Sequence, residues 1–391
     1  MPAPIDPFRN ELAQFGPTGI GAISRLGRGR EGLIPLWFGE SDLVTPAFIR
    51  DAAKQALDAG QTFYSDSRGV PPLRQSIHAW MQRHTGADIH IDRISVPGSA
   101  MLSIMIALQC LVRTGDEVIV ISPMWPNIFQ AIEVVGGVPK FVRLRQQHDG
   151  PWQLDTDELL AAIGPRTKAV FLASPSNPTG WIMTEAEQRI LLAACRERGV
   201  GIIADEVYGP IVFSGTHAPS FATLASDDDA LFIVNSFSKA WAMTGWRIGW
   251  LIHPLQHAEA LAAMSVSVNT GAASFVQAGA IAALDQGDSF LRTMRDRCLA
   301  NRTQLGEFVG RHPRLSWAEP PGGFYGFVAA EGVTNSMAFA EHLLEKANVG
   351  VAPGMAFGPR DDRDNDRHVR ICLAYDPARF AEALGRIGQV L

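Results

Sequence analysis

Five polar segments of this sequence each follow directly after a short aliphatic run. One ends on Lys239, another begins with Asp205, and a third begins with Asn177. The segments are Gly98-Ser99-Ala100, Pro123-Met124-Trp125, Asn177-Pro178-Thr179-Gly180, Asp205-Glu206-Val207-Tyr208 and Ser236-Phe237-Ser238-Lys239. If the aliphatic runs are strands of one open sheet, these segments meet at its carboxyl edge, where such sheets bind ligands. The sequence therefore predicts a site that combines an amine, a carboxylate, an amide, a phenol and a turn suited to phosphate.

These groups match what pyridoxal 5′-phosphate requires of a protein. This cofactor needs an amine for its aldehyde, an acid at its pyridine nitrogen, donors for its phenolic oxygen and phosphate, and a flat side chain against its ring. A nicotinamide-binding fold would have G-x-G-x-x-G after its first strand, and a P-loop would have G-x-x-x-x-G-K-[ST]. No such segment follows a predicted strand. We therefore expect pyridoxal 5′-phosphate as the cofactor.

The elements that position these residues are predicted to be strands alternating with helices. The predicted strands are Ile94–Val96, Val118–Ile121, Ala169–Ala173, Val200–Ala204, Leu231–Asn235 and Ile248–Ile252. Helices are expected at Ala100–Val112 and Thr184–Arg198, where Thr184 and Glu187 have the spacing of a capping box. This alternation predicts an α/β fold with a mostly parallel central sheet.

The pattern changes after about residue 280. The predicted elements there are a helix at Asp288–Arg311, a strand at Phe324–Ala329, a helix at Met337–Ala347 and a strand at His368–Ala374. Gly358–Arg367 is predicted to be a solvated charged loop. We expect a large cofactor-binding domain over residues 45–280, and a small α+β domain formed by residues 1–44 and 281–391.

Composition excludes several classes of protein. The 391 residues include 34 Lys+Arg and 40 Asp+Glu, a net charge of −6, which argues against nucleic-acid binding. No apolar run is long enough to span a membrane, and Met1–Asn10 lacks the order of a signal peptide, so we expect a cytoplasmic protein. The four cysteines have no metal-binding spacing and are predicted to be buried thiols, with no metal site; they are Cys110, Cys195, Cys298 and Cys372.

The motifs, in their order, resemble those of the class I and II aminotransferases, the fold-type-I pyridoxal-phosphate enzymes, over essentially the whole chain. The most specific is Ser236-Phe-Ser-Lys239, followed eight residues later by Arg247 in Thr-Gly-Trp-Arg-Ile-Gly. Asn177 in Ser-Pro-Ser-Asn-Pro-Thr-Gly, Asp205 in Ala-Asp-Glu-Val-Tyr and Arg370 in His-Val-Arg-Ile agree in the same order. The resemblance implies an aminotransferase that moves an amino group between an L-amino acid and a 2-oxo acid.

The resemblance also implies roles at the cofactor ring. Lys239 matches the lysine that forms the internal aldimine and then carries the proton at the substrate Cα, with a pyridoxamine-phosphate intermediate between the two half reactions. Asp205 matches the acid that keeps the pyridine nitrogen protonated, and Tyr208 and Asn177 match the donors to the phenolic oxygen. Trp125 stands where the family usually has an aromatic residue, more often Tyr, stacked on the ring. A lone residue of any of these types is more often a surface or turn residue, so the argument depends on the ordered set.

Further matches concern the phosphate and the substrate. The phosphate would be bound by the backbone at Ser99 and Ala100, by the hydroxyls of Ser236 and Ser238, and by Arg247. Tyr64 matches the tyrosine that reaches the phosphate of the neighbouring subunit, which implies a homodimer with shared active sites. Arg370, helped by the backbone of Gly39 and by Asn177, matches the clamp for the substrate α-carboxylate.

One departure from the family concerns substrate choice. One aspartate-specific subgroup has Lys-Gln where this chain has Ser99-Ala100, so a distal carboxylate lacks that partner here, although Arg25 or Arg28 could supply another. A carbon–sulfur β-lyase or an aminocyclopropane-carboxylate synthase would keep the same core residues. A pyridoxal-phosphate-binding sensor module is disfavoured, because no basic helix-turn-helix segment precedes the fold.

Overall fold

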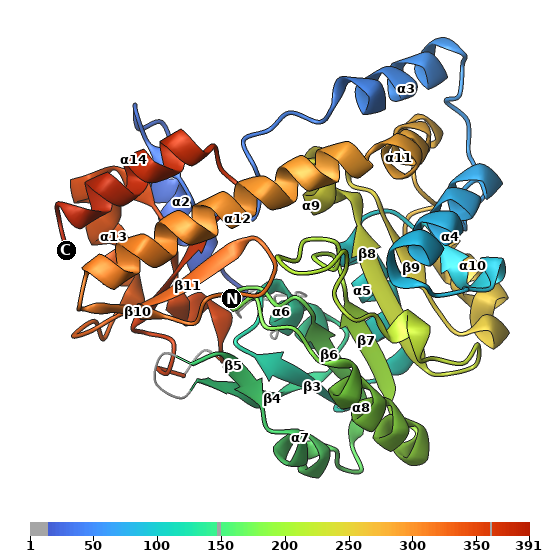
Figure 1. The fold of residues 1–391 in the computed structure, drawn as a ribbon. Coiled ribbons are helices and arrows are strands. Elements are labelled where there is room, and N and C mark those ends of the chain that lie inside the picture. The colour runs from blue at the N-terminus through green and yellow to red at the C-terminus, as the bar shows by residue number, and fades with distance from the viewer. Residues whose placement is uncertain (1–14, 147–149, 360–361) are drawn as a thin grey trace, which may run out of the picture.

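The computed structural model describes residues 15–146, 150–359 and 362–391, and its central feature is an eight-stranded sheet (Figure 1). In spatial order the strands are β2 (Ile94–Ser95), β9 (Gly249–Ile252), β8 (Leu231–Ser236), β7 (Gly201–Asp205), β6 (Thr167–Ala173), β3 (Glu117–Ser122), β4 (Val138–Gln146) and β5 (Trp152–Leu154). The five strands from β8 to β4 are parallel, whereas β9, β2 and β5 each run antiparallel to their neighbour. All six strands predicted in this region are present.

The sheet is covered on both faces by helices, and this explains its aliphatic sequence. Along β3, Val118 and Val120 belong to one hydrophobic cluster, whereas Ile119 and Ile121 belong to the other. Because a strand of this kind is buried on both faces, neither face needs polar side chains, and its sequence is a nearly continuous apolar run. One face packs against α5 (Ala100–Leu111), α6 (Asn127–Val134) and α10 (Ala258–Val268), and the other against α4 (Pro71–Thr85), α7 (Thr156–Ala162), α8 (Glu185–Arg198) and α11 (Ser274–Gln286).

Of the eight strands in this sheet, β4 and β5 have no counterpart among the predicted strands, and for β4 the sequence shows why. In β4, Val142 and Leu144 are buried, whereas Arg143 between them is half-buried and Arg145 after them is exposed. This strand lies next to the edge strand β5, so its aliphatic pattern is interrupted by charged residues. In contrast, the start of α8 is as predicted, because Thr184 and Glu187 form the reciprocal hydrogen bonds of a capping box.

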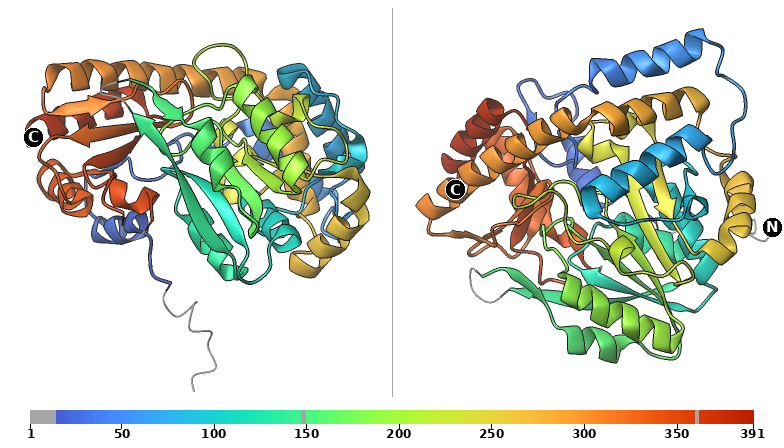
Figure 2. Two further views of the ribbon diagram at one scale, coloured as in Figure 1. Left: turned by 90° about the horizontal axis from the view of Figure 1, so that it is seen from below. Right: turned by 45° about the vertical axis from the view of Figure 1, so that its right-hand side comes forward.

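A second sheet has four antiparallel strands. They are β10 (Leu315–Trp317), β11 (Tyr325–Ala330), β14 (His368–Cys372) and β13 (Ala352–Pro353). Its helices are α12 (Asp288–Arg311), α13 (Ser336–Ala347) and α14 (Pro377–Gly388), and the long α12 runs from α11 past α9 (Phe237–Ala240) to this sheet (Figure 2). The fold is thus α/β, with a large mostly parallel sheet and a smaller sheet.

The N-terminal segment packs with the C-terminal part of the chain. Strand β1 (Ile34–Pro35) pairs in parallel with β12 (Val349–Gly350), and α2 (Gly19–Leu26) contacts β13 and α13. The next helix along the chain, α3 (Ala47–Asp58), packs against α11, one of the helices on the large sheet (Figure 1). Residues 35–46 therefore lead from the four-stranded sheet towards the large sheet.

Two predictions need correction. The segment Gly358–Arg367, of which residues 360 and 361 lie outside the described part, is not simply solvated. Asn365 and Asp366 are buried, and Asp362 pairs with Arg143 at 2.7 Å. Cys110 is exposed near the end of α5, whereas the other three cysteines are buried as expected.

Neither a membrane helix nor a metal cluster is found in the described residues. None of their helices combines the length and apolar character needed to cross a membrane. Among the same residues, no three His, Cys, Asp or Glu side chains gather in a way that could hold a metal ion.

Candidate active site

A cavity of about 460 Å³ lies between the carboxyl edge of the large sheet and the four-stranded sheet. All the residues predicted for the site line it except Ser99 and Tyr64. The predicted residues in its wall are Gly39, Ala100, Trp125, Asn177, Asp205, Tyr208, Ser236, Ser238, Lys239, Arg247 and Arg370. The large sheet supplies most of them from the segments that follow β3, β6, β7 and β8, and β14 of the smaller sheet supplies Arg370. The prediction that these segments meet at one edge is therefore confirmed.

Lys239 lies on the short helix α9 that follows β8. The side chain of Ser236 caps this helix by accepting a hydrogen bond from the backbone N–H of Ser238 at 3.1 Å, which turns the chain at the strand end. The Nζ of Lys239 donates a hydrogen bond to the carbonyl oxygen of Gly39 at 2.6 Å. Burial lowers the pKa of the Lys239 amine to about 8, and the nearby Arg370 cation acts in the same direction. About a tenth of this amine is therefore neutral and nucleophilic at pH 7, far more than for a lysine with the usual pKa of 10.5.

Asp205 is the last residue of β7 and is buried. One carboxylate oxygen accepts a hydrogen bond from the backbone N–H of Val207 at 3.1 Å. Burial raises the pKa of Asp205 to about 6, although the Val207 bond and the Lys239 charge oppose this shift. A buried carboxylate that lacks an ion pair is costly, so this position favours a cationic partner in the cavity.

Arg370 is buried in the wall of the cavity and is held from several directions. Its Nη1 donates to the Oδ1 of Asn177 at 2.8 Å, and its Nη2 donates to the carbonyl oxygen of Trp37. Its Cζ lies 4.2 Å from the ring centroid of Tyr325 and 4.9 Å from that of Phe357. Within the described part of the chain no carboxylate pairs with this guanidinium, so it is free to bind an anion that enters the cavity.

Tyr208 forms a hydrogen bond with Tyr325, a residue that none of the sequence motifs indicates. Its hydroxyl oxygen lies 2.6 Å from that of Tyr325, and both side chains are buried. Burial raises the pKa of Tyr208 above its usual value and that of Tyr325 to about 12, so both phenols are protonated at neutral pH. Tyr325 lies on β11, which pairs with β14. The register of this pairing cannot be deduced from the local sequence of either strand.

The phosphate-suited groups come from the start of α5, from α9 and from the segment that precedes β9. Helix α5 begins at Ala100. The backbone nitrogen of Ala100 lies close to the backbone of Gly249, because a Cβ at position 249 would lie only 3.0 Å from that nitrogen. Arg247 has a left-handed backbone with φ of 55°, and its Nη1 donates to the carbonyl oxygen of Thr244 at 2.7 Å. Ser99 caps α5 with its side chain and does not line the cavity.

Tyr64 does not reach this cavity in its own chain. Its side chain is 91% exposed and that of the adjacent Phe63 is 84% exposed. Arg25 and Arg28 are also exposed and lie outside the cavity wall, so the structure gives no support to either as a partner for a distal carboxylate. The N-terminal segment instead contributes Thr18, Ile20 and Gly21 to the wall.

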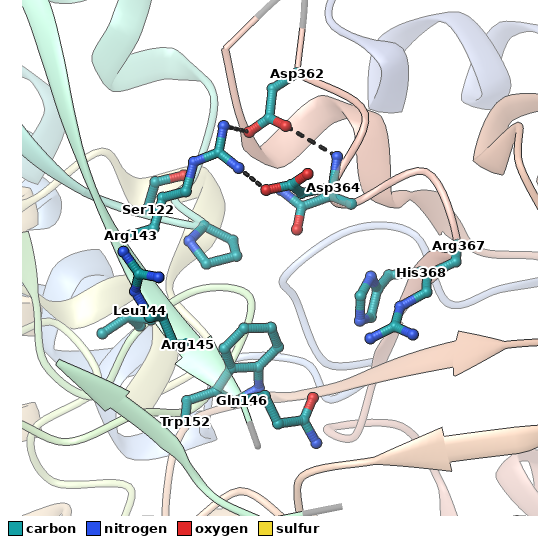
Figure 3. A pocket seen from close by; sticks show the side chains of 12 residues that line it. Ser122, Arg143, Leu144, Arg145, Gln146, Trp152, Asp362, Asp364, Arg367 and His368 are labelled. Carbon is teal, nitrogen blue, oxygen red and sulfur yellow. Dashed lines mark hydrogen bonds and ion pairs between the residues drawn. The ribbon is translucent and has the colours of Figure 1, made fainter. Parts of the chain in front are cut away.

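A second cavity, of about 720 Å³, holds none of the predicted site residues. It lies between the β4–β5 hairpin and the connection that precedes β14 (Figure 3). Arg143 crosses it to bind Asp362 and Asp364, and Arg145 pairs with Glu158. Both ring nitrogens of His368 and the indole nitrogen of Trp152 are covered by protein atoms. Arg143 and Arg145 are thus engaged in ion pairs, and these His368 and Trp152 nitrogens are inaccessible to solvent.

Comparison with known proteins identifies the family. The family described as aminotransferase class I and II matches residues 32–387. The chain belongs to this family. The chain is 33% identical over 360 residues to the probable aspartate/prephenate aminotransferase of Aquifex aeolicus. The matched region covers 90% of this chain and 89% of that protein.

Solved structures of aminotransferases agree with this assignment. A single mutant of Thermus thermophilus aspartate aminotransferase matches with a TM-score of 0.90 and 28% identity, over 99% of this chain and 100% of the other. YbdL from Escherichia coli, for which a methionine aminotransferase function has been identified, also matches with a TM-score of 0.90, at 25% identity over 99% of this chain and 100% of the other. The protein is therefore an aminotransferase of class I and II, a family that uses pyridoxal 5′-phosphate.

The residues of the smaller cavity fit this cofactor. Lys239 offers a partly neutral amine to an aldehyde, and Asp205 is a buried carboxylate for which the described residues provide no ion pair. Ser236, Ser238, Arg247 and the start of α5 offer donors to a phosphate. An amine, an acid, a phenol and a group of phosphate donors are the set that pyridoxal phosphate requires.

Proposed function

We propose that Lys239, Asp205 and Tyr208 carry out the chemistry of transamination in this cavity. When bound, pyridoxal phosphate supplies a ring that accepts electrons from the substrate Cα. Lys239 would hold the cofactor aldehyde, and its amine would take up and return the proton at the substrate Cα. Asp205 keeps the pyridine nitrogen protonated, and the hydroxyl of Tyr208 and the amide of Asn177 donate to the phenolic oxygen. The observation that carries this proposal is the gathering of Lys239, Asp205 and Arg370 in one cavity.

The remaining residues bind the ends of the cofactor and the substrate. Arg370 binds the α-carboxylate, assisted by Asn177 and the backbone of Gly39, because its guanidinium is buried without a carboxylate partner in the described residues. Ser236, Ser238, Arg247 and the backbone at Ser99 and Ala100 bind the phosphate. Trp125 stacks on the cofactor ring.

The active sites are shared within a homodimer. The strong exposure of Phe63 and Tyr64 supports this part of the proposal, because large apolar side chains exposed together mark an interaction surface. Tyr64 would then reach the phosphate bound by the other subunit. The boundaries proposed for the two domains remain 45–280 for the large one and 1–44 with 281–391 for the small one, and the proposed location is the cytoplasm.

The substrates are a neutral L-amino acid and a 2-oxo acid. Besides the residues assigned above and Tyr325, the polar side chains in the described cavity wall are those of Thr18 and Asn127, and the rest of the wall is apolar. Its apolar contributors include Ile20, Phe38, Met101, Ile104, Met124 and Trp125. A distal carboxylate buried there would lose its hydration without gaining a charged partner, whereas an apolar side chain is stabilised by leaving water.

The experiment that tests transamination is a screen of amino donors and oxo-acid acceptors on the purified protein. Each productive pair must consume donor and acceptor in equal amounts and release no ammonia. Release of ammonia together with a 2-oxo acid from the donor alone would instead identify a β-lyase. Cofactor binding without turnover of any pair would favour a sensor module.

A further inference from the structure

Tyr325 contacts one residue that the proposed function assigns to the cofactor, Tyr208, and one that it assigns to the substrate, Arg370. Its hydroxyl oxygen lies 2.6 Å from that of Tyr208, and the face of its ring lies 4.2 Å from the Cζ of Arg370. Tyr325 also lines the cavity itself. One side chain thus joins the phenol assigned to the cofactor and the guanidinium assigned to the substrate carboxylate. The inference that follows rests on that proposed function.

The direction of the bond between the two tyrosines follows from counting hydrogens. Each phenol is protonated and has one hydrogen to donate. If Tyr208 donates its hydrogen to the phenolic oxygen of the cofactor, the hydrogen shared by the two tyrosines must come from Tyr325. A donated hydrogen bond polarises the accepting hydroxyl and makes it a stronger donor in turn. Tyr325 therefore strengthens the bond by which Tyr208 stabilises negative charge on the cofactor.

The geometry around Tyr325 is fixed by its neighbours. A Cβ at position 39 would clash with the hydroxyl of Tyr325, so the glycine there leaves the space that this hydroxyl occupies. On β11 and β14, Tyr325 pairs with Cys372 and Phe327 pairs with Arg370, which places Tyr325 diagonally beside Arg370 on one face of the sheet. The guanidinium also contacts Phe357, whose ring centroid lies 4.9 Å from its Cζ. Rings against a guanidinium restrict its orientation and add cation–π attraction.

We propose that Tyr325 is a positioning residue with two separable functions. Its hydroxyl tunes the hydrogen bond of Tyr208 to the cofactor, and its ring orients Arg370 for the substrate carboxylate. The hydroxyl acts on the charge state of the bound cofactor, whereas the ring acts on substrate binding. The two functions predict different measurements for different substitutions.

Tyr325→Phe in the cofactor-loaded protein removes the hydroxyl and keeps the ring. The pH midpoint of the visible absorption of the bound cofactor should rise by about half a unit or more, because negative charge on the phenolic oxygen is less stabilised. The KM for amino acids should stay within about twofold of the wild-type value, since the ring still contacts Arg370. An unchanged pH midpoint in a folded, cofactor-loaded Tyr325→Phe protein overturns the proposed function of the hydroxyl.

Phe357→Leu is the matched control, because it removes the other ring at Arg370 and leaves both tyrosine hydroxyls in place. It should raise KM without moving the pH midpoint, whereas Tyr325→Leu should do both. If Tyr325→Leu raises KM no more than Tyr325→Phe does, the ring does not orient Arg370. Thermal unfolding of each variant separates these effects from simple loss of the fold. A wild-type protein that never acquires visible absorption would instead contradict the proposed function, which keeps the two failures distinct.

Discussion

The Nζ of Lys239 donates a hydrogen bond to the carbonyl oxygen of Gly39 at 2.6 Å, which joins helix α9 to the N-terminal segment. The same nitrogen is the one proposed to hold the cofactor. If Lys239 holds the cofactor as proposed, loading of the cofactor would replace this bond, and the carbonyl of Gly39 would become available to another donor. The lysine is thus already directed into the cavity before the cofactor binds.

Lys239→Ala should abolish covalent attachment of the cofactor. We expect wild-type protein to be yellow and, after borohydride reduction, to carry the label on the peptide that contains Lys239. Turnover should fall by a factor on the order of 10³ or more, since the variant loses both attachment and proton transfer. Lys168→Ala, which removes an exposed lysine of β6, is the control and should retain label and turnover. Full turnover by Lys239→Ala would falsify the assignment.

The rate at which cofactor-free protein captures pyridoxal phosphate should depend on pH through Lys239. Only the neutral amine attacks the aldehyde, and its pKa is lowered from 10.5 to about 8. In a stopped-flow absorbance measurement the capture rate should therefore rise with pH, be half-maximal at about pH 8 and level off at about pH 9. A rate that continues to rise towards pH 10 would mean that the amine is not desolvated.

Asp205→Asn should stabilise the cofactor-free protein while destroying its activity. The pKa of Asp205 is raised from 3.8 to about 6, so the folded state binds this proton more tightly than the unfolded chain does. The resulting contribution to stability is present below about pH 4 and is lost as pH rises through about 6. The asparagine carries no charge and can still accept from Val207, so the gain in Tm over wild type should be larger at about pH 8 than at about pH 4.

The same variant should slow transamination on the order of a thousandfold, which corresponds to a loss of about 4 kcal/mol of transition-state stabilisation. Asp58→Asn, at an exposed position at the end of α3, serves as the control for both measurements. Near-wild-type rates in Asp205→Asn would contradict the proposed contact with the pyridine nitrogen.

Mixing of inactive variants tests the shared active site. A dimer of one Lys239→Ala chain and one Tyr64→Ala chain has both lesions in one site and none in the other. Random re-pairing should therefore restore about a quarter of wild-type activity. Lys239→Ala mixed with Arg370→Ala should restore none, because each site then keeps one lesion. Equal recovery in both mixtures, or full activity of a monomer, would refute the sharing of Tyr64.

Neutral amino acids should have a higher kcat/KM than aspartate at a fixed acceptor concentration. Alanine, methionine and phenylalanine place no charge against Ile20, Met101 and Ile104, whereas aspartate does. Steady-state comparison of these donors decides the matter. A tenfold preference for aspartate would show that a cation from outside the described wall of this chain enters the site.

The site residues that can be predicted from the sequence are those that follow an aliphatic strand directly, because both the strand and its end are visible in the local sequence. The strands before Asn177, Asp205 and Lys239 are buried on both faces, so they appear as aliphatic runs and their ends are visible in the sequence. Tyr325 was missed because its place depends on the register of β11 against β14, a pairing between residues far apart in the chain. The side chain of Ser99 caps α5. A serine at this position suits a helix cap as well as a phosphate contact, so the residue type alone does not distinguish the two roles.

The glycine at position 39 also has a consequence for how this site can diverge among relatives. Any larger residue there would occupy the place of the Tyr325 hydroxyl. Positions 39 and 325 are therefore coupled: a side chain can be gained at 39 only where the one at 325 has been shortened or turned away. In an alignment of the family we expect these two columns to covary, with glycine at the first wherever tyrosine stands at the second.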